Sequence, residues 1–139
     1  MFERAEVRVD LERITANIKH FKELSGTPVM AVVKADAYGH GLVPVAKAAL
    51  EAGASSLGVA LLEEAITLRQ AGITAPILAW LVPPGSNYKL AVDNHIELAA
   101  SSIKALVEIG AVKSEFRPKV HLEVDTGMTR GGFLAEWGK

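Results

Sequence analysis

The sequence contains no cysteine among its 139 residues. Disulfide bonds, thiolate metal sites and a cysteine nucleophile are therefore excluded, and we predict no metal site. No apolar run is long enough to span a bilayer. The first residues also lack a basic segment followed by an apolar core, so we expect no signal peptide.

An excess of charge of either sign is also missing, since 15 basic residues stand against 16 acidic ones. A surface for nucleic acid or for a membrane is typically accompanied by a larger imbalance. We therefore expect a soluble cytoplasmic protein that binds neither nucleic acid nor membranes. Half of the residues are apolar, which is enough for one domain with a genuine core.

Helical and strand-like spacings of apolar residues alternate along the chain. An alternating segment at 6–9 predicts a short first strand, and Asp10 then caps a helix whose apolar stripe runs from Leu11 to Leu24. Further helices are predicted over 42–50, 63–71, 88–92 and 103–109. The predicted core strands cover 29–35, 56–61, 76–82, 97–101 and 119–124, of which 97–101 is weak.

This alternation predicts an α/β fold of right-handed βαβ units around a parallel sheet. No linker or change of composition divides the chain, so we predict one domain. Five such strands form either an open, doubly wound sheet or the first part of an eight-stranded barrel, which needs about 250 residues. The chain ends inside the expected start of another helix, which favours a truncated barrel.

The segment 29–41 places a lysine at the end of a buried strand. Its first half is apolar and β-branched, Lys34 follows, and Gly39 and Gly41 then turn the chain into a helix. Parallel α/β folds carry their chemistry at the carboxyl ends of the strands. A lysine there can lose its proton, and a free amine is what imine chemistry needs. The alternative is a lysine that merely extends from the strand end to water.

The last predicted strand provides an independent argument. His121, Glu123 and Asp125 share one face of it, while the alternate residues are apolar. In a parallel barrel the apolar face packs on helices, so the polar face points into the lumen. Arg130 follows in the next loop. We therefore predict a carboxylate–arginine site at the same barrel mouth as Lys34, with a solvated strand end as the alternative.

Two motifs resemble those of alanine racemases. The run Val-Val-Lys-Ala-Asp-Ala-Tyr-Gly-His-Gly at 32–41 resembles the family's pyridoxal-phosphate attachment motif, and 121–130 resembles its fifth-strand motif. The start, Val9-Asp10-Leu11 with Asn17, is also similar. The resemblance implies a partial (β/α)8 TIM-type barrel with about five parallel strands. It implies that residues 1–139 are the amino-terminal part of a pyridoxal-phosphate-binding barrel domain, without the family's carboxy-terminal β domain.

The resemblance also implies roles for single residues. Lys34 would hold pyridoxal 5'-phosphate as a Schiff base and serve as one of two acid/base groups. Tyr38 would contact the cofactor phosphate, and Val32 and Trp80 would line the cofactor pocket. Arg130 would bind the substrate carboxylate and the phenolic oxygen of the cofactor.

Two further expectations concern supporting residues. We expect His40 to support the glycine turn through a backbone hydrogen bond rather than to act as an acid or base. Glu123 stands where the family usually has a carbamylated lysine, whose anion fixes the arginine matching Arg130. Our hypothesis is that Glu123 supplies a permanent carboxylate instead; unchanged turnover and arginine placement in Glu123→Gln would refute it.

The implied function is interconversion of L-alanine and D-alanine, which supplies D-alanine for cell-wall peptidoglycan in a homodimeric enzyme. We expect this chain alone to be inactive, because the family's second acid/base group lies in the carboxy-terminal domain of the partner subunit. The alternatives are a non-catalytic pyridoxal-phosphate-binding homeostasis protein, a decarboxylase on the same barrel, and an α/β domain without a cofactor.

Overall fold

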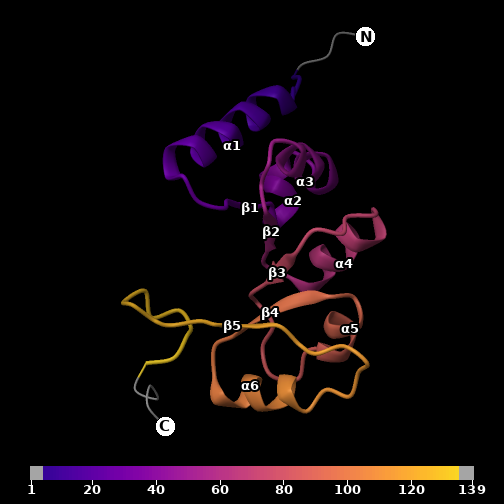
Figure 1. The fold of residues 1–139 in the computed structure, drawn as a ribbon, viewed down its shortest axis with the longest axis vertical. Coiled ribbons are helices and arrows are strands. Elements are labelled where there is room, and N and C mark those ends of the chain that lie inside the picture. Colours follow the sequence, from indigo (N-terminus) through magenta and orange to yellow (C-terminus); the bar gives the residue numbers. More distant parts are fainter. Residues whose placement is uncertain (1–4, 135–139) are drawn as a thin grey trace.

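The five strands found in the computed structural model, which describes residues 5–134, form one parallel sheet. They are β1 (Met30–Val32), β2 (Ser56–Val59), β3 (Ile77–Ala79), β4 (Ile96–Ala100) and β5 (Val120–Leu122). Each strand pairs with its neighbour in sequence, in the order β1-β2-β3-β4-β5. A doubly wound sheet reverses its strand order at a switch point. The sheet therefore follows the path of a barrel wall, with β1 and β5 at its edges (Figure 1).

Helices alternate with these strands, as the apolar spacing predicts. They are α1 (Leu11–Ser25), α2 (Lys34–Gly39), α3 (Leu42–Glu51), α4 (Leu62–Gln70), α5 (Tyr88–Asp93) and α6 (Ile103–Gly110). The Asp10 carboxylate caps α1 by accepting a hydrogen bond from the Arg13 N–H at 3.1 Å, which confirms the predicted start. Within residues 5–134, none of the helices has both the length and the apolar composition that crossing a bilayer requires.

The two faces of the sheet differ in burial. Side chains alternate along each strand, and one set packs under the helices as the core. This outer set comprises Ala31, Val33, Leu57, Val59, Ile77, Ala79, Ile96, Leu98 and Ala100, all buried. Each fully buried leucine or isoleucine contributes about 1.5–3 kcal/mol. The register pairs Leu98 with Val120 and Ala99 with His121, so His121 lies on the inner face, as predicted.

Three expectations about the elements need correction. The segment 6–9 forms no strand and is exposed, because no neighbouring strand pairs with its alternating pattern. The predicted strand 29–35 is shorter, since β1 covers only Met30–Val32 and α2 begins at Lys34. The segment 97–101, expected to be weak, is instead the well-buried β4.

Candidate functional site

Lys34 follows β1 and begins α2, whose residues 35–38 form a left-handed turn instead of a regular right-handed helix. Ala35, Asp36, Ala37 and Tyr38 have φ angles of 52°, 54°, 50° and 54°. For residues other than glycine, this conformation costs about 1–2 kcal/mol each. Such strain persists only where contacts with the surrounding structure stabilise the strained conformation, and strained residues are concentrated at functional sites. The sequence predicted a tight turn at the glycines, and Gly39 and Gly41 do have positive φ angles of 82° and 94°. It did not predict that the four residues before them share the left-handed conformation.

Side chains on both sides hold this turn. The Asp36 carboxylate accepts a hydrogen bond from the Leu42 N–H at 2.6 Å, which also satisfies the first residue of α3. His40 Nδ1 lies 2.8 Å from the Ala37 carbonyl oxygen, which confirms the supporting role predicted for His40. The Glu64 carboxylate of α4 accepts the Ala35 N–H at 2.5 Å. Sequence reasoning missed Glu64, although a glutamate in the first turn of a helix is a capping signal.

The half-buried Lys34 lies beside Tyr38. Its Nζ is 5.4 Å from the centre of the Tyr38 ring, within the range of a cation–π interaction. The Tyr38 side chain is 72% exposed, so its hydroxyl is free of the core. The structure thus brings together the two residues that the attachment motif singled out.

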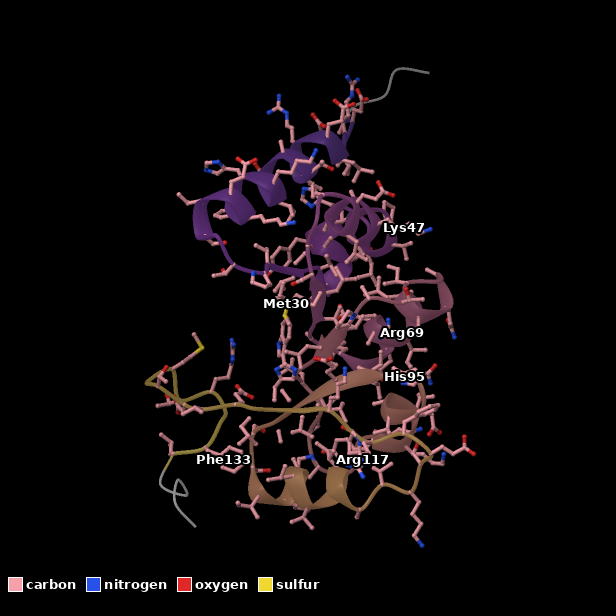
Figure 2. The ribbon with its side chains drawn as sticks, viewed as in Figure 1. Met30, Lys47, Arg69, His95, Arg117 and Phe133 are labelled. Carbon is pink, nitrogen blue, oxygen red and sulfur yellow. The ribbon has the colours of Figure 1, made fainter. Side chains whose placement is uncertain are left out.

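An apolar wall lies on the inner face of β1, β2 and β3. A Cβ built on Gly58 would lie 3.0 Å from Trp80 Cζ3, 3.1 Å from Met30 Sδ and 3.3 Å from Val32 Cγ2. The three side chains therefore meet over a glycine that leaves room for them; Met30 is labelled in Figure 2. Val32 remains 56% exposed. The structure thus places Val32, at the end of β1, and Trp80, directly after β3, together over Gly58 of β2.

The loop after β5 folds back on its own strand. The Glu123 carbonyl oxygen accepts the Phe133 N–H at 2.8 Å, and the Phe133 carbonyl oxygen accepts the Asp125 N–H at 3.1 Å. Asp125 Oδ1 accepts the N–H groups of Gly127 at 2.8 Å and Thr129 at 3.0 Å. The bonds from Thr129 and Gly127 hold the pKa of Asp125 below its ordinary value. Asp125 therefore organises this loop, contrary to the expectation that it joins a lumen site.

The expected pair between Glu123 and Arg130 is not formed within residues 5–134. Glu123 Oε1 lies 3.5 Å from the position of a Cβ on Gly131, so the carboxylate lies against the backbone that follows the arginine. The Arg130 side chain is exposed. The fold-back of the loop thus brings the two residues to one region without an ion pair.

His121 has a partner that the sequence did not predict. Its Nε2 lies 2.8 Å from a carboxylate oxygen of Glu97 on β4, and Lys119 Nζ lies 3.4 Å from the other oxygen. The Glu97 side chain is only 15% exposed. A lone glutamate between Ile96 and Leu98 is the signal that could have identified this pair.

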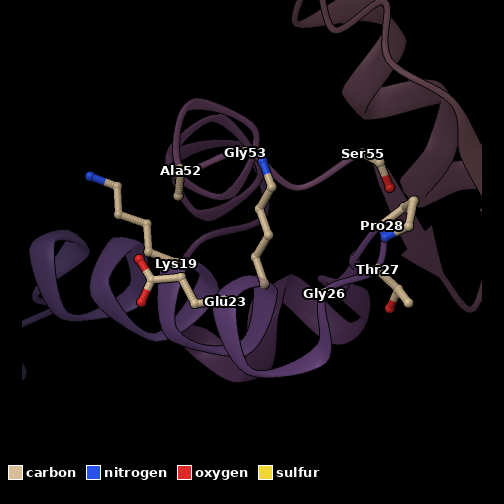
Figure 3. A pocket seen from close by; sticks show the side chains of 9 residues that line it. Lys19, Glu23, Gly26, Thr27, Pro28, Ala52, Gly53 and Ser55 are labelled. Carbon is tan, nitrogen blue, oxygen red and sulfur yellow. The ribbon is translucent and has the colours of Figure 1, made fainter.

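A cavity of about 730 Å³ lies at the opposite end of the strands. It is bounded by α1, by the segment before β1 and by the turn at Ala52 and Gly53 (Figure 3). Its charged lining side chains, Lys19, Lys22 and Glu23, are exposed. Because the chemistry of parallel barrels lies at the carboxyl ends of the strands, the Lys34 region is the stronger candidate.

Known proteins resemble almost the whole chain. A family model described as "Alanine racemase, N-terminal domain" matches residues 9–138. The alanine racemase of Thermobifida fusca is 50% identical over 137 residues, which cover 96% of this chain and 37% of that protein. The chain thus spans little more than a third of the length of this relative.

Solved structures show the same architecture. Alanine racemase from D-cycloserine-producing Streptomyces lavendulae aligns with a TM-score of 0.85 at 40% identity, over 93% of this chain and 35% of that one. A histidine racemase from Leuconostoc mesenteroides aligns with a TM-score of 0.79 at 38% identity, over 89% of this chain and 34% of that one. The likeness confirms the predicted fold class, an α/β partial (β/α)8 TIM-type barrel.

Proposed function

The chain belongs to the alanine racemase family, and from this premise we propose that the whole protein interconverts L-alanine and D-alanine. The observation that carries the proposal is Lys34, a half-buried amine held in a strained turn at the carboxyl end of β1. Family membership supports pyridoxal 5'-phosphate as the cofactor. Residues 1–139 would then be the amino-terminal part of the domain that binds this cofactor.

The described residues fit such a cofactor. Its planar ring needs an amine to bind it and an apolar wall beside it. Lys34 offers the amine, and Val32 and Trp80, packed over Gly58, offer the wall. When bound, the cofactor supplies an aldehyde carbon for amines and an electron sink that makes the α-proton of an amino acid acidic.

The side chains of this chain would divide the remaining work. Lys34 Nζ would bind the cofactor and move the α-proton on one face of the amino acid. The Tyr38 hydroxyl would donate a hydrogen bond to the cofactor phosphate. Arg130 would bind the carboxylate of the amino acid by charge-assisted hydrogen bonds, and Glu123 would supply the negative charge that supports this arginine.

Alanine is the proposed substrate, and histidine is the competing one. The histidine racemase among the structural neighbours shares this part of the barrel at nearly the same identity as the alanine racemases. Turnover of L-alanine, L-histidine and L-serine by the whole protein, followed on a chiral column, separates the candidates. A preference for L-histidine would replace alanine in the proposal.

We further propose the setting of the reaction from the family. The whole protein would act as a homodimer in the cytoplasm and supply D-alanine for peptidoglycan. The partner subunit's carboxy-terminal domain would provide the acid/base group on the opposite face of the amino acid.

Covalent trapping tests the central residue. The whole protein is incubated with pyridoxal 5'-phosphate, reduced with borohydride, digested, and its modified lysines are identified by mass spectrometry. We expect the adduct on Lys34 and its loss in Lys34→Ala, while Lys47→Ala, a change at an exposed lysine on α3, retains it. Modification spread evenly over exposed lysines, with none favoured at position 34, would contradict the proposal.

A further inference from the structure

The Glu64 carboxylate lies where β1 and β2 end. Its Oε1 accepts the Ala35 N–H at 2.5 Å, and its Oε2 accepts the Ala60 N–H at 3.0 Å and the Leu61 N–H at 2.9 Å. Glu64 is half-buried in the first turn of α4. One carboxylate thus receives three backbone donors from two strand ends that are far apart in sequence.

The two oxygens serve different purposes. Oε2 caps α4 locally, because Ala60 and Leu61 immediately precede that helix. Oε1 reaches 29 residues back, to the peptide that joins Lys34 to Ala35. A helix cap alone explains the first set of bonds and leaves the second unexplained.

The peptide that Oε1 holds is the one that orients Lys34. Ala35 is the first of the four residues with left-handed φ angles, and an alanine gains nothing from that conformation by itself. Hydrogen bonds to a charged acceptor are about twice as strong as neutral ones. The bond therefore opposes relaxation of the turn at the residue next to the reactive amine.

We propose that Glu64 is a positioning residue for the Lys34 amine. Through the Ala35 N–H it fixes the backbone from which the lysine side chain leaves β1, and through Ala60 and Leu61 it ties that backbone to the end of β2. This role rests on the proposed function, because the amine has a reaction to be positioned for only if it binds an aldehyde cofactor.

The test compares two lysines within one molecule. The Lys34 Nζ attacks the aldehyde carbon of pyridoxal 5'-phosphate, one water leaves, and hydride from borohydride reduces the resulting C=N bond to a secondary amine. The measured quantity is the ratio of adduct on Lys34 to adduct on Lys47, determined by mass spectrometry at short reaction times. Because general loosening of the fold would also lower the Lys34 adduct, the ratio is compared at a temperature where circular dichroism shows every variant to be fully folded. Under that condition the ratio reports positioning.

We expect Glu64→Ala to lower this ratio about tenfold, a factor that corresponds to about 1.4 kcal/mol. Glu64→Gln keeps one acceptor oxygen but turns an amide donor toward backbone donors. Its ratio should therefore lie between that of the unaltered protein and that of Glu64→Ala. Glu63→Gln, which removes an equal charge from the same helical turn at an exposed position, should leave the ratio unchanged. The Ala35 amide resonance should shift in both Glu64 variants and stay in place in Glu63→Gln.

The outcomes separate the two proposals. Absence of a preferred Lys34 adduct in the unaltered protein would overturn the proposed function, and the positioning role with it. A Lys34 adduct that forms at the same ratio in the Glu64 variants would overturn the positioning role alone. If Glu64→Ala does not fold by circular dichroism, the isosteric Glu64→Gln decides by the same ratio.

Discussion

At the scale of single residues, three acidic side chains near the barrel mouth are engaged by hydrogen bonds from the backbone. Asp36, Glu64 and Asp125 each accept backbone N–H groups in or beside a loop at the barrel mouth. Of these three, only Asp125 was expected near a cation, in a carboxylate–arginine site with Arg130, because charge is visible in a sequence and backbone donors are not. Acidic residues here shape the loops that carry Lys34 and Arg130.

Asp125 provides a prediction about pH. Hydrogen bonds from Thr129 and Gly127 lower the folded-state pKa of Asp125. The stability that its carboxylate adds to the folded loop is therefore fully present above the ordinary aspartate pKa of about 3.9, and it is lost as the pH falls through the lower folded value. We expect the amide resonances of Gly127 and Thr129 to move together during that acid titration. Asp125→Asn should abolish the movement, and identical titrations in both proteins would contradict this account.

At the scale of elements, Arg69 joins a helix to the starts of two strands. Its guanidinium donates to the carbonyl oxygens of Ile73 and Ala75 at 2.7 Å each, and of Asn94 and His95 at 2.9 Å each. Arg69 on α4 therefore bridges the segments before β3 and β4 (Figure 2). Burial lowers the pKa of Arg69, and the negative charge of Glu97 opposes this effect.

We expect Arg69→Met to destabilise the fold by about 3 kcal/mol, because four carbonyl oxygens lose a charged donor. The melting temperature should fall by about 10 °C, measured by circular dichroism. Arg13→Met serves as the matched control, since Arg13 is exposed on α1 and bonds only the Asp10 carboxylate among the described residues. Equal melting temperatures for the two variants would show that the hydrogen bonds of Arg69 add little to the stability of the fold.

At the scale of the whole molecule, water reaches the part of the inner face of the sheet nearest to Lys34. Val32 is 56% exposed and Tyr38 is 72% exposed, and the sheet ends at β1 and β5 without closing. Racemisation needs a site that excludes water and a second acid/base group on the opposite face of the amino acid. The described residues offer Lys34 for one face.

We therefore expect the 139-residue chain alone not to produce D-alanine above the level of its Lys34→Ala variant. The measurement is chiral chromatography after incubation with L-alanine and pyridoxal 5'-phosphate. D-alanine formation by the chain that disappears in Lys34→Ala would contradict this expectation.

The sequence by itself determined the alternation of helices and strands, the outer and inner faces of β5, and the place of Lys34 after β1. These features depend on spacings of two to four residues, which apolar periodicity records directly. His40 also behaved as predicted, since its partner Ala37 lies three residues away.

Apolar spacing by itself left both a barrel wall and a doubly wound sheet open; the family resemblance implied the barrel, and the tertiary structure showed the strand order, which is set by packing between distant units. The same holds for the bonds from Glu64 to Ala35 and from His121 to Glu97, which join residues 29 and 24 positions apart. The left-handed turn after Lys34 was also decided by the tertiary structure. Its backbone conformation is unfavourable by itself, and contacts with residues distant in sequence stabilise it.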